Sequence, residues 1–224
     1  MFCGTELKFF KLCFVYLGII NNMEVIKEKD ISIEKIVKSL KNGKVIVYPT
    51  ETSYGLGADA TNEEAVNKIF KIKKRQVGKS VLIVMSNIEM AMQYVEWSEK
   101  LNELTQKYWP GPLTVVMPLK SGHNLASGVV AIDNTLAFRI SSHPLITELT
   151  KKLNKPIVST SANISAQGDS YNAQEIINVF EKEVSQPDIV IDAGELPEKS
   201  PSTIIRLING KLEVLRQGQI KIDH

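Results

Sequence analysis

The sequence predicts an α/β fold in which helices cover the faces of a twisted, mixed β-sheet. From residue 30 onward, segments whose apolar residues recur at helical spacing alternate with short, continuous apolar segments, as in helices packed on a buried sheet. Clusters of small polar residues directly follow several of the apolar segments, where open α/β sheets place their ligand sites. The chain has 224 residues, 43% of them hydrophobic, which is enough for one sizeable core.

Helix signals occur in five places along the chain. Asp30 and Ser32 are candidate N-caps for a helix that Asn42-Gly43 ends, and Thr61 opens a T-x-x-E capping box. Pro144 stands at the first position of a later helix, where its missing N–H leaves no bond unmade. The predicted helices lie near residues 33–40, 61–71, 101–108, 144–153 and 172–183.

Strand signals are the short apolar segments between these helices. Asn209-Gly210 joins the last two segments as a β-hairpin, because this dipeptide readily adopts the positive φ angles of a type I′ turn. The predicted strands are residues 44–48, 80–85, 113–119, 136–140, 155–160, 188–192, 202–207 and 211–216.

The first 22 residues stand apart from this pattern. The apolar run from Leu12 to Ile20 follows lysines, but no small-residue cleavage site comes after it, as one would in a signal peptide. The run is also shorter than the ~20 apolar residues of a membrane-spanning helix. We therefore expect residues 1–22 to be an N-terminal extension outside the core, and we expect no association with a membrane.

Charge and cysteine usage exclude several classes of protein. The net charge of +2 is too small to indicate a protein that binds nucleic acid through bulk charge alone. Cys3 and Cys13 are the only cysteines and the three histidines are scattered, which argues against a disulfide framework or a zinc site. This usage suits a reducing compartment, so we expect the protein in the cytoplasm.

The first polar cluster is YPTETSYGLG, from Tyr48 to Gly57, which follows a predicted strand. A tight turn would explain its proline and glycines. It would not explain Thr50 and Thr52, whose hydroxyls would project to the same side of an extended segment and suit a small polar ligand. Both interpretations stay open from these residues alone.

The second cluster is KIKKRQVGK, from Lys71 to Lys79, at the end of a predicted helix. One or two of its cations would interact favourably with the helix dipole, and a solvated basic face is an alternative for the rest. Lys73 and Arg75 alternate, so in an extended chain they would face one way and could bind a polyanion such as phosphate.

The third cluster is STSANIS, where Ser159, Thr160, Ser161 and Asn163 follow a predicted strand. Backbone N–H groups and hydroxyls at such a strand end can bind phosphate. The G-x-x-x-x-G-K-[ST] signature of P-loop proteins is absent. Ser161 lacks the G-x-S-x-G context of a hydrolase nucleophile and has no histidine placed as its base, so we assign it to binding.

A fourth signal is Arg139, a single charge within an apolar predicted strand. Arginine is rarely buried without an anionic partner. Its partner must be a carboxylate, either from the fold or from a ligand.

Together these segments resemble the YrdC-like family of threonylcarbamoyl-AMP synthases, in its short single-domain form. The resemblance rests on YPTETSYGLGADA, KKR, YWPGPLTVVM, FRISSHPL, PIVSTSANIS, PSTII and VLRQGQI, which occur in the family's order between about residues 24 and 221. It implies a YrdC-like catalytic domain at residues 23–224, with a concave surface like that of double-stranded-RNA-binding proteins. The implied activity is the synthesis of threonylcarbamoyl-AMP and pyrophosphate from L-threonine, bicarbonate and ATP. The product serves the threonylcarbamoyladenosine modification of tRNA through a downstream threonylcarbamoyl transferase.

The resemblance also implies roles for individual residues. The catalytic set that surrounds the nucleotide phosphates falls on Lys73, Arg75, Ser161 and Asn163. Further ATP-contacting positions, beside Arg75 and Ser161, fall on Lys79, Thr135 and Arg216. The threonine-side positions fall on Thr52, Arg139, Ser159 and Ser202. No metal ligand from the protein is implied, since Mg²⁺ would travel with the triphosphate of ATP.

The chain departs from the family pattern at three positions. Gln76 and Gln217 replace usual prolines, and Val84 stands where many members have histidine on the threonine side. Two alternatives come from other classes of protein. One is a module that binds double-stranded RNA or tRNA by shape without catalysis. The other is the similar carbamoyl-transfer domain of a hydrogenase-maturation protein, which would bring zinc-finger cysteines that this sequence lacks.

Overall fold

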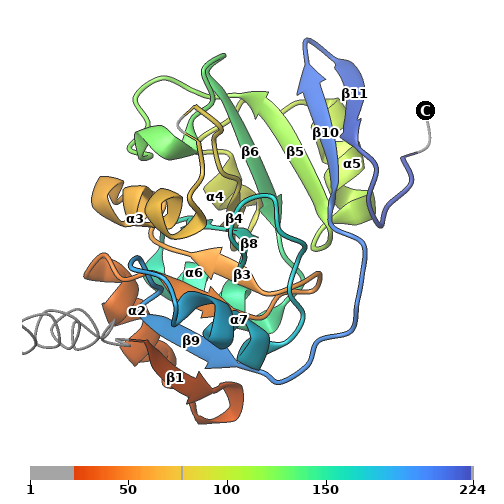
Figure 1. The fold of residues 1–224 in the computed structure, drawn as a ribbon. Coiled ribbons are helices and arrows are strands. Elements are labelled where there is room, and N and C mark those ends of the chain that lie inside the picture. The colour runs from red at the N-terminus through yellow and green to blue at the C-terminus, as the bar shows by residue number, and fades with distance from the viewer. Residues whose placement is uncertain (1–22, 77, 223–224) are drawn as a thin grey trace, which may run out of the picture.

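The chain folds around two mixed β-sheets that lie one above the other in Figure 1. The computed structural model describes residues 23–76 and 78–222. The first sheet contains, in spatial order, β1 (Glu24–Lys27), β9 (Ile189–Asp192), β2 (Ile46–Tyr48), β3 (Gly55–Gly57) and β8 (Thr160–Ser161). The second contains β11 (Lys211–Arg216), β10 (Thr203–Ile208), β5 (Leu113–Pro118), β6 (Thr135–Ile140), β4 (Ile83–Met85) and β7 (Ile157–Val158). Parallel and antiparallel pairs occur in both sheets.

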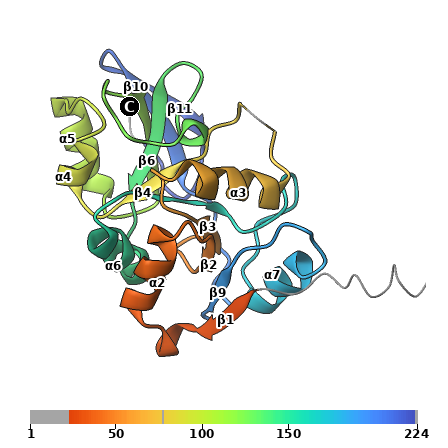
Figure 2. The same ribbon diagram turned by 90° about the vertical axis from the view of Figure 1, so that its left-hand side faces the viewer.

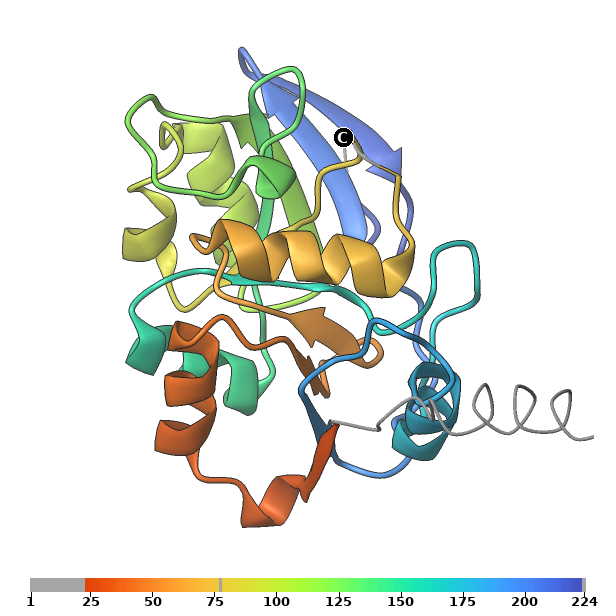
Figure 3. The ribbon, with the colours of Figure 1, turned by 60° about the vertical axis from the view of Figure 1, so that its left-hand side comes forward.

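Helices cover the sheets on several sides. They are α2 (Ile33–Lys41), α3 (Glu63–Lys73), α4 (Ile88–Ala91), α5 (Glu99–Tyr108), α6 (Pro144–Leu153) and α7 (Ala173–Phe180), with short 3₁₀ turns η1 (Glu28–Asp30) and η2 (Ser127–Val129). Figure 2 shows α2 next to α6, which contacts β4 of the second sheet, and it shows α4 and α5 beside that sheet. In Figure 3, α3 lies across the middle of the molecule, between the β10–β11 hairpin and the end that carries α2.

The predicted α/β class with helices on its faces is confirmed, but the single predicted sheet is two sheets. The predicted strand at 155–160 explains the difference, because it is interrupted and changes sheets. Its first part, β7, pairs with β4 of the second sheet, and its continuation, β8, pairs with β3 of the first. Ser159 lies between the two, and its backbone N–H donates to the carbonyl of Leu82 at 2.9 Å.

Local signals located most of the elements and misplaced a few boundaries. Ser32 caps α2 by accepting from the Lys35 N–H, as the sequence predicts. The predicted capping box at Thr61 is wrong by one residue, because the Asn62 side chain accepts from the Ala65 N–H and is the cap of α3. The predicted helix at 172–183 ends at residue 180.

Three other predictions for local segments had different outcomes. The predicted Asn209-Gly210 turn is confirmed, with φ angles of 51° and 73°. The glycine-rich segment at Gly55–Gly57 is strand β3 and not a turn. The predicted N-terminal extension, residues 1–22, lies outside the described part of the chain. Among the described residues, no helix is long and apolar enough to span a membrane.

Candidate active site

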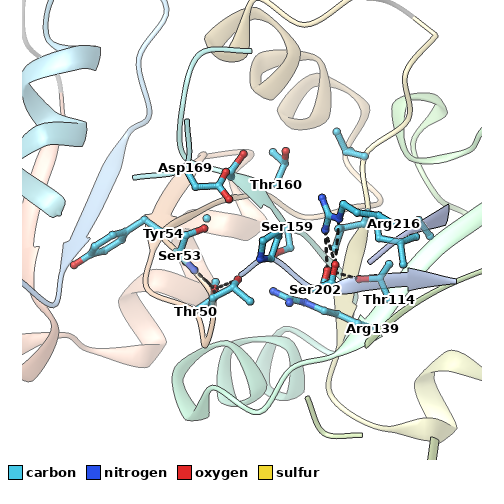
Figure 4. A pocket seen from close by; sticks show the side chains of 18 of the residues that line it. Thr50, Ser53, Tyr54, Thr114, Arg139, Ser159, Thr160, Asp169, Ser202 and Arg216 are labelled. Atoms are coloured by element: carbon cyan, nitrogen blue, oxygen red, sulfur yellow. Dashed lines mark hydrogen bonds between the residues drawn. The ribbon is translucent and has the colours of Figure 1, made fainter. Parts of the chain in front are cut away.

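A cavity of about 290 Å³ opens at the junction of the two sheets. The turn after β2 and the Ser159–Ser161 segment form one wall, and the second sheet forms the other. In Figure 4, Thr50 and Ser53 lie on one side of Ser159, and Thr114, Ser202 and Arg216 lie on the other. The strand that changes sheets therefore brings the two walls together.

The turn between β2 and β3 presents its hydroxyls to the cavity. Thr50 and Thr52 are both buried, and their Oγ1 atoms lie 2.9 Å apart, on the same side as predicted. The Thr50 hydroxyl donates to the Ser53 carbonyl at 2.6 Å and accepts from the Thr52 backbone N–H at 3.1 Å. The residues between β2 and β3 thus form a turn whose threonine hydroxyls line the cavity, and the binding of a polar ligand by these hydroxyls stays a prediction.

Tyr48 explains why β3 is built from glycines. Its ring is fully buried and covers the first and last residues of β3. A Cβ atom at Gly57 would lie 2.6 Å from Tyr48 Cε1 and 3.1 Å from Ile157 Cγ2. Only glycine allows the strand to approach the ring this closely.

Arg75 follows α3 and lines the cavity together with Ser80. Its Nε donates to the Lys79 carbonyl and its Nη2 to the Ser80 carbonyl, each at 2.9 Å. Burial lowers the pKa of Arg75 from its ordinary value. These carbonyls hold the side chain in place and leave its positive charge uncompensated.

Lys73 lies behind the cavity wall and not in it. The residue is only 2% exposed, and its Nζ donates to the carbonyls of Ser161 (2.5 Å) and Asn163 (2.9 Å) and to Asn163 Oδ1 (2.7 Å). The Ser161 hydroxyl donates to the same Oδ1 at 2.8 Å. Burial, with the nearby charge of Arg75 as a second cause, lowers the pKa of Lys73 to about 8. Lys73 thereby fixes the segment from Ser161 to Asn163, which we call the Ser161 turn.

Arg216, at the end of β11, meets the opposite wall. Its Nε and Nη2 donate to the Ser202 carbonyl at 3.1 and 2.8 Å, and Nη2 also reaches Ser202 Oγ at 3.1 Å. Ser202 Oγ lies 2.9 Å from Thr114 Oγ1. Burial lowers the pKa of Arg216, and Asp169 opposes the shift. Like Arg75, this guanidinium group is bound by neutral oxygens.

Arg139 has a carboxylate partner within the fold. Its Nη1 lies 3.0 Å from Glu51 Oε1, and the two side chains are 5% and 11% exposed. These two atoms form an ion pair, but their geometry does not meet the angle of a hydrogen bond. Arg139 Nε has no hydrogen-bond partner among the described residues. The sequence left open whether the carboxylate partner of Arg139 comes from the fold or from a ligand, and among the described residues Glu51 is such a partner. Arg139 also lines the cavity.

The structure brings together seven of the eleven predicted site residues. The residues that line the cavity are Thr52, Arg75, Arg139, Ser159, Ser161, Ser202 and Arg216. Four others do not line it. Lys73 and Asn163 support the Ser161 turn, Lys79 is exposed and offers its carbonyl to Arg75, and Thr135 is buried and donates to Asp133 Oδ1 at 2.6 Å.

Sequence reasoning missed several residues at or beside the cavity, and three of them bear on its chemistry. Thr114 lies in an apolar strand, Asp169 lies in a loop without a recognisable motif, and Glu51 lies between the two conspicuous threonines. Glu51 could have been found, because a buried arginine requires an anionic partner. Glu51 is the carboxylate of the first polar cluster, between Thr50 and Thr52.

The three departures from the family pattern lie outside the cavity lining. Val84 is buried in the apolar cluster against α2 and α6. Gln217 uses its side-chain amide to bond the carbonyls of Gly218 (3.1 Å) and Ile220 (2.7 Å), so it ties the loop that follows β11. Gln76 is exposed.

The charges around the cavity favour an anionic ligand. Of the residues that the structure describes, Arg75, Arg139 and Arg216 bring three guanidinium groups to its lining, and Asp169 brings one carboxylate. Arginine binds carboxylate and phosphate groups with a planar pair of donors. No cluster of His, Cys, Asp or Glu able to hold a metal ion occurs in the described part of the chain.

A two-sheet α/β fold with a polar, arginine-lined cavity at the sheet junction is typical of the class of proteins that bind small anionic ligands. The chain belongs to the Sua5/YciO/YrdC family, whose model, described as "Telomere recombination", matches residues 38–218. It is 39% identical over 165 residues to a threonylcarbamoyl-AMP synthase of Pseudoalteromonas atlantica, a match that covers 72% of this chain and 85% of that protein.

Solved structures share the fold. P. abyssi Sua5 complexed with L-threonine matches with a TM-score of 0.77 and 30% identity, over 88% of this chain and 57% of that chain. This chain therefore spans less than two thirds of that protein's length. E. coli YciO matches with a TM-score of 0.76 and 24% identity, over 88% of this chain and 95% of that one.

Proposed function

We propose that the protein is an L-threonylcarbamoyladenylate synthase, which makes threonylcarbamoyl-AMP and pyrophosphate from L-threonine, bicarbonate and ATP. The observation that carries the proposal is the cavity lining. Two guanidinium groups bound only by neutral oxygens, Arg75 and Arg216, suit a polyphosphate. The hydroxyls of Thr52 and Ser159 and the charge of Arg139 suit a small amino acid. The named synthase at 39% identity and the threonine complex of a related structure support the same assignment.

The reaction needs no nucleophile from the protein. The threonine amine adds to the carbon of bicarbonate and water leaves, which gives a carbamate. A carbamate oxygen then attacks the α-phosphorus of ATP, and the bond to pyrophosphate breaks. The protein must hold three reactants in line and neutralise phosphate charge, which are the contributions that fixed arginines and hydroxyls can make.

We assign the residue roles from the cavity lining and, for residues that do not line the cavity, from the family resemblance and their hydrogen bonds. Arg75, Ser161 and Arg216 contact the nucleotide, with Lys79 and Thr135 as the further ATP positions that the resemblance implies. Thr52, Arg139, Ser159 and Ser202 contact the threonine. Lys73 and Asn163, which belong to the implied catalytic set, act by holding the Ser161 turn.

Mg²⁺ fits the site as an ion carried by ATP. The cavity lining offers a single carboxylate, from Asp169, and Mg²⁺ is commonly bound by one or two carboxylates together with substrate phosphates. When bound, the ion would neutralise charge on the phosphates.

The cellular setting of this reaction is also a proposal. ATP and tRNA are cytoplasmic, so we place the protein in the cytoplasm, where a separate threonylcarbamoyl transferase consumes the adenylate and modifies tRNA. A double-stranded-RNA-binding module without catalysis would not require a cavity lined by three arginines. Weak RNA binding beside catalysis stays a prediction.

The test is reconstitution with purified protein, ATP, MgCl₂, L-threonine and ¹³C-labelled bicarbonate. We expect pyrophosphate release that requires both threonine and bicarbonate, and a threonylcarbamoyl-adenylate that carries the label in mass spectrometry. Omission of each component in turn is the control. ATP turnover that continues unchanged without threonine would indicate a simple ATPase and refute the proposal.

A further inference from the structure

Glu51 occupies an unusual position for a carboxylate. It lies between two threonines that line the cavity, but its own side chain is almost buried beneath Arg139. One oxygen lies 3.0 Å from Arg139 Nη1, and the other accepts from Ser141 Oγ at 2.5 Å. Ser141 is itself buried and receives the His143 backbone N–H at 3.2 Å. Both oxygens of Glu51 are thus tied to the end of β6 and the residues that follow it.

This arrangement holds the guanidinium group of Arg139 without using up its donors. Arginine has five N–H donors, and within the described residues the Arg139 side chain has the ion pair at Nη1 and no hydrogen bond at Nε. A buried ion pair is expensive to desolvate and is a weak source of stability. Its retention beside a cavity therefore calls for a role in the site.

The three arginines differ in whether a carboxylate neutralises their charge. Arg75 and Arg216 bind neutral oxygens, and no described carboxylate lies within ion-pair distance of either one. Arg139 is neutralised by Glu51. Arg75 and Arg216 therefore offer guanidinium groups without an ion-paired carboxylate, which suits a polyanion, whereas Arg139 offers donors with little net charge.

We propose that Glu51 is a positioning and specificity-determining residue, which orients Arg139 and reserves its guanidinium group for the carboxylate of a zwitterionic amino acid over a polyphosphate. The inference rests on the proposed function. A carboxylate that already faces the guanidinium group would repel a multiply charged phosphate, whereas a zwitterion brings a balancing ammonium group with its single negative charge.

The test compares Glu51→Gln with Ser141→Ala and with Glu64→Gln, an exposed control on α3. In the wild type, pyrophosphate should compete with ATP and not with threonine. In Glu51→Gln, we expect the KM for threonine to rise about tenfold or more, with the KM for ATP nearly unchanged. Pyrophosphate should now also compete with threonine, because the charge at Arg139 is no longer balanced.

Ser141→Ala separates orientation from charge. It removes the hydroxyl that fixes Glu51 but keeps the carboxylate, so the KM for threonine should rise while pyrophosphate still competes with ATP alone. Because this variant loses only one oxygen atom, it tests the proposal even if Glu51→Gln fails to fold. Glu64→Gln should match the wild type throughout.

Three outcomes would overturn the inference. They are an unchanged KM for threonine in Glu51→Gln, an equal rise in both KM values with a lower melting temperature, and an unchanged KM for threonine in Ser141→Ala. A wild-type protein that forms no adenylate would instead refute the proposed function, so the two failures are distinguishable.

Discussion

Lys73 should give activity and stability opposite dependences on pH. Its protonated amine has three N–H donors, and the structure supplies three oxygen acceptors, from Ser161 and Asn163. The neutral amine retains two donors, so one of these three hydrogen bonds is lost and the Ser161 turn loosens. Because burial lowers the pKa of Lys73 to about 8, we expect activity to fall as pH rises through about 8.

The free energy of unfolding should change in the other direction. The folded pKa of about 8 lies below the ordinary value of 10.5, a gap worth roughly 3 kcal/mol at about 1.4 kcal/mol per pH unit. Between these two values the unfolded chain binds more protons at this lysine than the folded chain does. The contribution of Lys73 to stability is therefore lowest below pH 8 and rises as pH increases toward 10.5.

The assay follows pyrophosphate release and urea unfolding from about pH 6.5 to 9.5 in the wild type, in Lys73→Met and in Lys71→Met. Lys71 is an exposed residue of the same helix and is the matched control. We expect Lys73→Met to have low activity without the basic limb, and its stability relative to the wild type to decrease as pH rises. A wild-type activity profile that stays flat through pH 9, or a basic limb that survives in Lys73→Met, would refute this reasoning.

Three further substitutions test other parts of the structure. Arg75→Lys keeps the charge but cannot make both bonds to the loop carbonyls, so the KM for ATP should rise about tenfold; an unchanged KM would contradict its assignment to the nucleotide. Gly57→Ala places a methyl group against the Tyr48 ring and should cost about 1–3 kcal/mol in urea unfolding, whereas Gly168→Ala, with open space around it, should not. Asn62→Ala removes the cap of α3 and should cost about 1 kcal/mol, and equal stability would mean that this cap is dispensable.

The sequence predicts those elements whose signals are local. The helix from Ile33 and the hairpin at Asn209-Gly210 are confirmed, because apolar spacing, caps and turn residues act within a few positions. Strand β3 was not predicted, since Gly55–Gly57 reads as a turn. Its extended form depends on pairing with β2 and on the ring of Tyr48, which are non-local contacts.

The residues of the candidate site also divide into those that local motifs identify and those that depend on non-local contacts. Motifs identified Arg75, Ser161 and Arg216, and the structure brings all three to one cavity. Spacing along the chain could not show that Lys73 lies behind the wall, because α3 ends in a left-handed residue that turns the chain between positions 73 and 75. The Glu51 partner of Arg139 joins segments 88 residues apart, and no periodicity reports such a pair.

The strand that changes sheets has a thermodynamic consequence. Ser159 is bonded to Leu82 of one wall, and Ala162 is bonded to Tyr54 of the other, each at 2.9 Å. The sheets cannot separate without breaking backbone hydrogen bonds on this shared segment, so widening of the cavity is a local unfolding event. A ligand that contacts both walls opposes that event, and its binding free energy adds to the free energy of unfolding. Amide protons in both sheets would then exchange more slowly together when the cavity is occupied, including those of residues that never touch the ligand.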